Sequence, residues 1–460
     1  MKGKPDIICA LSSPPGMGAL AIIRLSGSGC MALLSAVFSK DISSKATHTA
    51  HHGWILSEEE KVDDVVVTLF HSPKSFTGED TVEISCHGST YVQQRIIELL
   101  LSRGARLAKP GEFSMRAYLN AKMDLSQAEA VADLIASESA ASHRQALHQM
   151  RGGFSREIKS LRERLVHFAS MIELELDFAE EDVEFANRPQ LELLVTEILA
   201  MVNRLRESFS LGNAIKNGVP VAILGAPNSG KSTLLNTLLN EERAIVSEIP
   251  GTTRDTIEDY ITLGGIRFRF IDTAGIRHTS DSIEKMGIER AFDQAKSASV
   301  ILLLFDSIET NAAQLSDMLG QIKNQTGDEK RILLLANKID VLRFDEVKFK
   351  SEFSGFKNLV LISAKNKLHI EELKNELLEL VNATRIMSGE TIVTNARHYE
   401  ALTQSALSLN EVLTGLQNGL TGDLLAVDLR KTLFHLGEII GEVNADDLLH
   451  NIFSKFCIGK

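Results

Sequence analysis

Residues 221–236 read VAILGAPNSGKSTLLN, an apolar run that is followed by a glycine-rich loop and then by a helix-forming segment. The pattern G-x-x-x-x-G-K-[ST] between a strand and a helix is typical of a P-loop, whose backbone N–H groups and helix N-terminus bind phosphate oxygens. We expect Lys231 to reach the β- and γ-phosphates and Ser232 to bind Mg²⁺. The stretch therefore predicts a nucleotide-binding α/β domain.

Apolar runs alternate with helix-forming segments between about residues 218 and 383. Buried strands that alternate with helices are typical of a doubly wound α/β domain. The runs are VPVAILG, RFRFIDTAG, SVILLLFD, RILLLANK and NLVLISA. We expect residues 218–383 to form one such domain, with the P-loop directly after its first strand.

Further short motifs follow the P-loop in the order expected of a GTPase. GTTRD begins at Gly251, DTAG at Asp272, NKID at Asn337 and SAK at Ser363. The carboxylate of Asp340 can accept hydrogen bonds from both N1–H and N2–H of guanine, a donor pair that adenine does not have. The ordered set predicts that the bound nucleotide is GTP.

The remaining motif residues have expected roles around the phosphates and the base. Thr253 supplies the second hydroxyl for Mg²⁺, Asp272 the carboxylate on the magnesium side, and Gly275 a contact to the γ-phosphate. The backbone N–H of Ala364 can donate to guanine O6. The predicted GTP-binding residues are Asn228, Ser229, Gly230, Lys231, Ser232, Thr233, Ser247, Glu248, Ile249, Pro250, Gly251, Thr252, Thr253, Asp272, Thr273, Ala274, Gly275, Asn337, Lys338, Asp340, Ser363 and Ala364.

The residue after DTAG is unusual for a GTPase. Ras-like proteins have a glutamine there that orients the attacking water, whereas this chain has Ile276, which cannot hydrogen-bond to water. Asp281 and Glu284 follow nearby, and either can position the water. Both can also be solvated surface charges, so the residues alone leave the choice open.

Two helical stretches flank this domain. Apolar residues recur with helical spacing in both, and they are Ala128, Val131, Ala132, Ile135, Leu161, Leu165, Phe168, Ile172, Leu425, Leu429, Leu433, Leu436 and Ile440. Residues 1–120 read as mixed strand and helix. We therefore expect an N-terminal α+β domain (1–120), a helical domain in two parts (121–217 and 384–460), and an α/β domain inserted between them (218–383).

Composition is that of an ordinary globular protein, with 44% hydrophobic and 24% charged residues and a net charge of −12. No apolar run is long enough for a membrane span or a signal peptide, and the four cysteines form no C-x-x-C pair. A reducing cytoplasm is the expected compartment. The basic stretch RGGFSREIKSLRER and the acidic stretch that follows it are either solvated helix faces or, for the basic one, a nucleic-acid contact.

The chain as a whole resembles the MnmE (TrmE) family of tRNA-modification GTPases. The resemblance covers nearly the full length and rests on the motifs SFTGEDTVEISCHG, KPGEFSMRAYLNAKMDLSQAEAVADLI, GAPNSGKSTLLN, AIVSEIPGTTRD, DTAGIR, IEKMGIERA and the terminal FCIGK. It implies a tetrahydrofolate-binding, dimerising N-terminal domain, a split all-helical domain and an inserted Ras-like G domain. It also implies a homodimer in a heterotetramer with an FAD-dependent MnmG-like partner, since the chain itself has no G-x-G-x-x-G loop.

The resemblance assigns further residues. K⁺, which would switch on hydrolysis when two G domains pair, would be bound by Asn228, Ser247, Ile249 and Thr252. The catalytic glutamate falls on Glu284 rather than Asp281. A reduced folate of the 5-formyl- or 5,10-methylene-tetrahydrofolate type would be bound by Arg24, Glu83, Lys122 and Lys460. The implied reaction places an aminomethyl-type group on the wobble uridine of certain tRNAs, with glycine or ammonium left open as second substrate.

The tail allows three interpretations. Cys457 lies four residues from the end, but the final Gly459-Lys460 is a poor prenylation signal, so a lipid-anchored GTPase is disfavoured. Asn444 can cap a helix whose apolar stripe is Leu449, Ile452, Phe453 and Phe456. Such a helix would carry Cys457 to the folate site, or Cys457 would be a buried cysteine without chemistry. A ribosome-assembly GTPase without folate chemistry is the alternative function.

Overall fold

The computed structural model describes residues 6–58, 60–177, 187–242, 259–271, 295–326, 330–341, 344–381 and 391–443, and in the tail residues 449, 452–454, 456, 457 and 459. The chain divides into two compact units. Unit 1 contains Met1–Ala136, Ala146–Val202 and Ala401–Lys460, and unit 2 contains Ser137–Gln145 and Asn203–Glu400. Within the described ranges, no helix is long and apolar enough to cross a membrane.

The N-terminal part of unit 1 contains a six-stranded sheet with the order β3-β4-β5-β2-β1-β6. Its strands are antiparallel except for the pair β1 and β6. The strands are β1 (Ile8–Leu11), β2 (Leu20–Ser26), β3 (Thr49–Ser57), β4 (Glu60–Phe70), β5 (Thr81–His87) and β6 (Arg106–Leu107).

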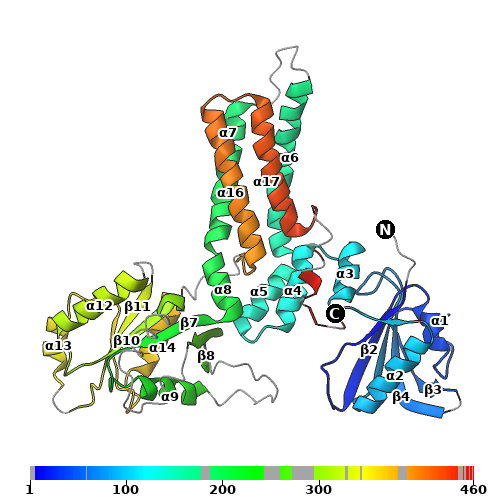
Figure 1. The fold of residues 1–460 in the computed structure, drawn as a ribbon, viewed down its shortest axis with the longest axis horizontal. Coiled ribbons are helices and arrows are strands. Elements are labelled where there is room, and N and C mark those ends of the chain that lie inside the picture. Colours follow the sequence, from blue (N-terminus) through cyan, green and yellow to red (C-terminus); the bar gives the residue numbers. More distant parts are fainter. Residues whose placement is uncertain are drawn as a thin grey trace. The chain divides into compact units, whose positions relative to one another are not determined.

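One face of this sheet is the core. Alternate strand residues such as Ile23 and Ile84 pack against apolar residues of α1 (Cys30–Ser35) and α2 (Thr90–Ser102), two helices that Figure 1 shows beside this sheet. The residues between them, which include Arg24 and Glu83, point to the other face, because successive side chains of a strand alternate. The α+β character expected for this part is therefore present.

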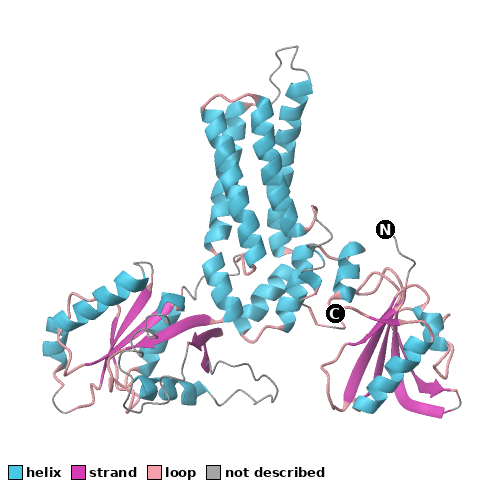
Figure 2. Cartoon of the chain, viewed as in Figure 1, coloured by secondary structure: helices cyan, strands magenta, loops and turns pink. Residues whose placement is uncertain are grey.

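The rest of unit 1 is helical (Figure 2). It contains α3 (Glu112–Leu119), α4 (Leu125–Ile135), α6 (Gly153–Asp177), α17 (Gly422–Ile440) and most of α7 (Arg188–Glu207) and α16 (Ala396–Gln417). Asp124 and Gln127 form a reciprocal capping box that begins α4. The expected apolar stripes of α6 and α17 are buried almost throughout, and α6 packs along α17, so these predictions are confirmed.

Unit 2 contains a second six-stranded sheet, with the order β12-β11-β10-β7-β9-β8. All neighbours are parallel except β8 and β9. The strands are β7 (Val219–Leu224), β8 (Asp259–Leu263), β9 (Ile266–Phe270), β10 (Val300–Asp306), β11 (Arg331–Asn337) and β12 (Leu359–Leu361). The apolar runs of the sequence fall on five of these strands.

Helices pack on both faces of the sheet in unit 2. Alternate residues of β10 belong to different apolar clusters, with Leu302 in one and Leu303 in the other. The first cluster includes α9 (Lys231–Glu242), α14 (Ile370–Leu380) and α8 (Phe209–Asn217), and the second includes α12 (Ala312–Thr326) and α13 (Glu346–Glu352). A strand that is buried on both faces explains the unbroken apolar run VILLLF.

The helix α5 (Ala140–Met150) begins in unit 2 and continues into unit 1. Its first turn is anchored on the hairpin that joins β8 to β9, where the backbone N–H of Ala141 donates to the carbonyl of Gly265 at 3.1 Å. The Ala141 side chain is part of the apolar core of unit 2. Residues 137–145 are thus packed with the sheet of unit 2, although they precede it by more than 70 residues in the chain.

Candidate functional sites

The P-loop connects β7 to α9, as the sequence predicts. The Lys231 ammonium group donates to the carbonyls of Gly225 and Ala226, both at 2.8 Å. Burial lowers the pKa of Lys231. Gly230 has φ 104°, and a Cβ there would lie 2.3 Å from Nδ2 of Asn337, so only glycine fits. The hydroxyl of Ser229 is buried and has no hydrogen-bond partner in the described part of the chain.

Asn337 joins the P-loop to the loop that follows β12. Its Nδ2 donates to the carbonyl of Ser229 at 2.7 Å, and its Oδ1 accepts from the backbone N–H of Ala364 at 3.0 Å. The N–H predicted to meet guanine O6 is therefore already bonded to Asn337. Because Asn337 is only 3% exposed, this residue sets the spacing between the two loops rather than lying on their surface.

Asp340 is held at both carboxylate oxygens. Oδ1 accepts from the Ser363 hydroxyl at 2.7 Å, and Oδ2 accepts from the Asn366 side chain at 3.0 Å. Two donors from the loop after β12 thus orient the carboxylate proposed to bind guanine. Each oxygen keeps a second lone pair for a base donor.

Two residues of this site were missed by the sequence reasoning. Asn366 directly follows SAK, and its position in the motif loop was the available signal. Asp306 ends β10 and pairs with Lys338 at 2.7 Å. Burial would raise the pKa of Asp306, but the hydrogen bonds from Lys338 and from the N–H groups of Ile308 and Glu309 lower it overall. A polar residue at the carboxyl end of an apolar strand was the signal for Asp306.

Part of the predicted GTP site lies outside the described residues. Thr233 is described and is the third residue of α9, after Lys231 and Ser232. The positions outside are Ser247, Glu248, Ile249, Pro250, Gly251, Thr252, Thr253, Asp272, Thr273, Ala274, Gly275, Ile276, Asp281 and Glu284. Of the four predicted K⁺ ligands, only Asn228 is therefore described, and it has a left-handed backbone with φ 62°.

The second predicted site lies on the face of the unit 1 sheet that is opposite to its core with α1 and α2. Arg24 on β2 faces Glu83 on β5 in the strand register, and both its Nε (2.9 Å) and its Nη2 (2.7 Å) donate to Glu83 Oε1. The guanidinium carbon also lies 5.6 Å from the ring centre of Phe76 and 5.7 Å from that of Phe113. The pair is thus fixed by hydrogen bonds and by two aromatic rings.

The C-terminal tail reaches this pair. The carbonyl of Gly459 accepts from Arg24 Nη1 at 3.4 Å and from the Ser12 hydroxyl at 3.2 Å. Cys457 is exposed, so the interpretation that this cysteine is buried is wrong. Lys122 instead donates to the carbonyl of Pro73 at 2.8 Å, and no described contact joins it to Arg24 or Glu83. Lys460 lies outside the described residues.

The predicted apolar stripe of the tail is confirmed where it is described. Leu449 and Phe453 are buried with Leu125 and Ala128 of α4, and Ile452 and Phe456 pack against the same cluster. Asn444 is among the residues that the structure does not describe. The tail is thus anchored by its side chains on the helical part and by its last backbone groups on the sheet.

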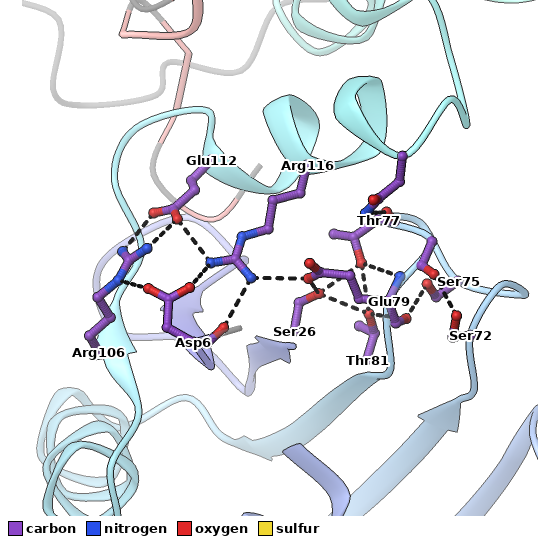
Figure 3. A network of polar contacts seen from close by, with 12 residues as sticks. Asp6, Ser26, Ser72, Ser75, Thr77, Glu79, Thr81, Arg106, Glu112 and Arg116 are labelled. Atoms are coloured by element: carbon purple, nitrogen blue, oxygen red, sulfur yellow. Dashed lines mark hydrogen bonds and ion pairs between the residues drawn. The ribbon is translucent and has the colours of Figure 1, made fainter. Parts of the chain in front are cut away.

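A network of ion pairs supports this region (Figure 3). Arg116 on α3 donates to Asp6, to Glu79 and to Glu112, and Arg106 pairs with Asp6 and Glu112. Burial would raise the pKa of Glu112, but hydrogen bonds from Arg106, the Lys109 N–H and Arg116 lower it overall. The same balance lowers the pKa of Asp6. The network fixes the start of α3 against the sheet.

Known proteins match this chain along nearly its whole length. The family described as "MnmE helical domain" matches residues 125–457, and the family described as "GTP-binding protein TrmE N-terminus" matches residues 7–122. Proteins named "tRNA modification GTPase MnmE" from Cytophaga hutchinsonii, Christiangramia forsetii and Flavobacterium johnsoniae are 56%, 54% and 54% identical. Each alignment covers 99% of this chain and at least 98% of the relative.

Some solved structures match part of this chain. The G domain of the T. maritima FeoB iron transporter is 26% identical, covers 35% of this chain and 98% of its own, and has a TM-score of 0.25. The two family models and the full-length relatives agree with each other. The chain therefore belongs to the MnmE family of tRNA modification GTPases.

Proposed function

We propose that this chain is a potassium-activated GTPase that acts with an FAD-dependent, MnmG-like partner on the wobble uridine of certain tRNAs. It would use the one-carbon unit of a reduced folate to install an aminomethyl or carboxymethylaminomethyl group. The observation that carries the proposal is the contact of the tail carbonyl of Gly459 with Arg24, beside Glu83. A ribosome-assembly GTPase that binds no folate would have no need for this contact.

The P-loop is suited to bind GTP. The space around Gly230 admits no side chain, the Ser229 hydroxyl is buried without a partner in the described part, and Lys231 brings a positive charge. These features fit a group rich in phosphate oxygens. Lys231 would release the loop carbonyls to bind phosphate, Ser232 and Thr253 would hold Mg²⁺, and Asp340 would read guanine.

Potassium is proposed as the activator because this chain has no glutamine after DTAG. Asn228, Ser247, Ile249 and Thr252 would bind K⁺ through amide, hydroxyl and carbonyl oxygens, which are ligands that K⁺ accepts. The cation would neutralise phosphate charge when the G domains of a homodimer pair. Glu284 would orient the attacking water.

The Arg24–Glu83 pair is suited to a pterin with a glutamyl tail. Both hydrogen bonds from Arg24 go to Oε1 of Glu83, which leaves Oε2 available to accept from a pterin N–H group. Arg24, Lys122 and Lys460 would supply positive charge for carboxylates. The bound folate would be of the 5-formyl- or 5,10-methylene-tetrahydrofolate type, and it would supply the carbon that is transferred.

The proposed domains have the bounds that the sequence predicts. Residues 1–120 would bind folate and dimerise, 121–217 and 384–460 would form the helical domain, and 218–383 would form the Ras-like, doubly wound G domain. A cytoplasmic location is proposed because tRNA, GTP and reduced folate are all available there.

Deletion of Cys457–Lys460 tests the folate part. Because the deletion removes the carbonyl that contacts Arg24, we expect weaker protection of the purified protein by 5-formyl-tetrahydrofolate in a thermal melt. Modified wobble uridine, measured by mass spectrometry of tRNA from a complemented null strain, should disappear, while GTP hydrolysis stays near normal. A truncated protein that still modifies tRNA, or a full-length protein that the folate does not protect, contradicts the proposal.

A further inference from the structure

Two glycines of unit 1 meet the backbone of the tail at points where no side chain fits. Gly111 precedes α3 and has φ 65°, and Gly459 has φ 96°. Both values lie in the left-handed region that glycine adopts at little cost. The two contacts lie on either side of Cys457 in the chain, so they bear on where its thiol is held.

Gly111 provides the first contact. A Cβ at this position would lie 2.4 Å from the carbonyl oxygen of Phe453 and 3.1 Å from its Cβ. The backbone N–H of Gly111 points to the carbonyl of Cys457, at 3.4 Å. The α-carbon and the N–H of one glycine thus face two tail residues that are four positions apart. Gly111 thus contacts Phe453, four residues before Cys457, and the carbonyl of Cys457 itself.

Gly459 provides the second contact. A Cβ there would lie 2.3 Å from the carbonyl oxygen of Leu11 and 3.1 Å from the α-carbon of Ser12. Its carbonyl accepts from the Ser12 hydroxyl and from Arg24. Gly459 is buried. These contacts hold its backbone against Leu11 of β1 and Arg24 of β2.

Both contacts rest on rigid parts of unit 1. The residue after Gly111 is Glu112, which is 4% exposed and is held by Arg106 and Arg116. Phe453 is buried in the cluster with Leu125 and Ala128. On the other side, Leu11 is the last residue of β1. Phe453 and Gly459 are thus each held against a packed part of unit 1.

Cys457 differs from the other cysteines of the chain. Cys9, Cys30 and Cys86 are buried, and burial raises the pKa of their thiols to about 11, 12 and 11. Cys457 is exposed. It is the one described cysteine that a reagent in water can reach, and it lies between the two glycine contacts.

We propose that Gly111 and Gly459 are positioning residues, which fix the tail backbone on both sides of Cys457 and so hold its thiol at one place beside the Arg24–Glu83 pair. This inference rests on the proposed function of that pair. Positioning of a reacting group matters because a displacement of about 1 Å can cost roughly 100-fold in rate.

The test compares Gly111→Ala and Gly459→Ala with Gly104→Ala in the full-length protein. Gly104 is a matched control, because its φ is 103° but no atom lies within 4 Å of a Cβ built there. A nitroxide spin label on Cys457 reports the mobility of the tail. We expect the spectral lines to narrow toward those of a disordered chain end in the first two variants, and to stay as in the unchanged protein for Gly104→Ala.

Unlabelled protein supplies the second measurement. For Gly111→Ala we expect kcat of tRNA modification to fall about 100-fold, with KM for the reduced folate little changed and GTP hydrolysis unaffected. A purely structural effect would instead let thiol reagents reach Cys9, Cys30 and Cys86. If thiol reagents reach these three cysteines in Gly111→Ala, the inference is tested with Gly459→Ala instead. The same two measurements are made on that variant, the mobility of the spin label and kcat of tRNA modification.

Two results would overturn the inference. One is a spin label on Cys457 that stays immobile in Gly111→Ala while kcat of tRNA modification stays at its full value. Where Gly111→Ala fails to fold, the same result in Gly459→Ala counts instead. The other is a loss in Gly104→Ala as large as in Gly111→Ala, because backbone strain alone would then explain it. If the unchanged protein neither binds folate nor modifies tRNA, the proposed function fails, and the spin label still shows whether the glycines hold the tail.

Discussion

Replacement of Arg116 by leucine should destabilise unit 1 strongly. The guanidinium group donates to the Asp6 carbonyl (3.1 Å) and carboxylate (2.7 Å), to Glu79 (3.1 Å) and to Glu112 (3.1 Å). The Arg116 side chain is 11% exposed, and loss of one partner from a buried ion pair costs about 3–5 kcal/mol. Glu112 keeps Arg106 and Glu79 keeps Ser26, so we expect the lower end, about 3 kcal/mol.

This free-energy change is measurable by calorimetry of the full-length protein. At about 2–4 °C per kcal/mol, the melting temperature of unit 1 should fall by roughly 6–12 °C. The transition of unit 2 is identified because GDP should raise it and leave that of unit 1 unchanged. Arg103→Leu is the control, since the Arg103 side chain is exposed and makes no hydrogen bond or ion pair among the described residues. A fall for Arg116→Leu no larger than for Arg103→Leu would refute the reasoning.

The same variant should change the acid sensitivity of unit 1. The folded-state pKa values of Asp6 and Glu112 lie below their ordinary values of 3.8 and 4.5. The stabilisation from these carboxylates is therefore present above the ordinary pKa and is lost as pH falls through the lower, folded-state pKa. In the unchanged protein the melting temperature of unit 1 should fall below about pH 4.5, and this fall should be smaller in Arg116→Leu, which has lost one cation.

Four further predictions concern GTP. Asp340→Asn should weaken GTP binding and reduce or invert the preference over a xanthine nucleotide, and an unchanged preference in fluorescence titrations would exclude NKID as the base-reading loop. Asn366→Ala should weaken GDP binding by less than Asp340→Asn, because Ser363 still holds one carboxylate oxygen, and a loss equal to that of Asp340→Asn would contradict this order. Hydrolysis should be faster in K⁺ than in Na⁺, and Glu284→Ala should abolish it without loss of GTP binding; equal rates in the two salts, or a loss in Asp281→Ala instead, would contradict the assignments.

The sequence predicted best what depends on local pattern. Lys231 and Asp340 could be named because the motif, the strand before it and the helix after it are contiguous in the chain. The Leu449–Phe453 stripe was found in the same way, from helical spacing. Asn366 was missed because its contact with Asp340 forms only when the loops after β11 and β12 lie side by side.

Contacts between distant segments left no signal in the sequence. Glu112 is four residues before Arg116 on α3, but Asp6 and Glu79 have no periodic relation to Arg116, so nothing marked these two as its partners before the fold placed α3 on the sheet. The same holds for Gly111, whose motif supported the family resemblance but not its contact with Phe453.

The anchoring of Ala141 on the β8–β9 hairpin bears on how the GTPase part can be handled in isolation. A fragment cut at residues 218 and 383 would lose Ala141, Ile215 and Ile392, which belong to its apolar core, and would leave that surface open to water. Such a fragment would be prone to self-association and would melt early, so a low GTPase rate measured on it would reflect its cut edges. The compact unit that contains the GTPase motifs also includes Ser137–Gln145, which precedes the inserted segment in the chain. A chimaera that exchanges G domains between relatives would therefore have to exchange this short upstream segment as well.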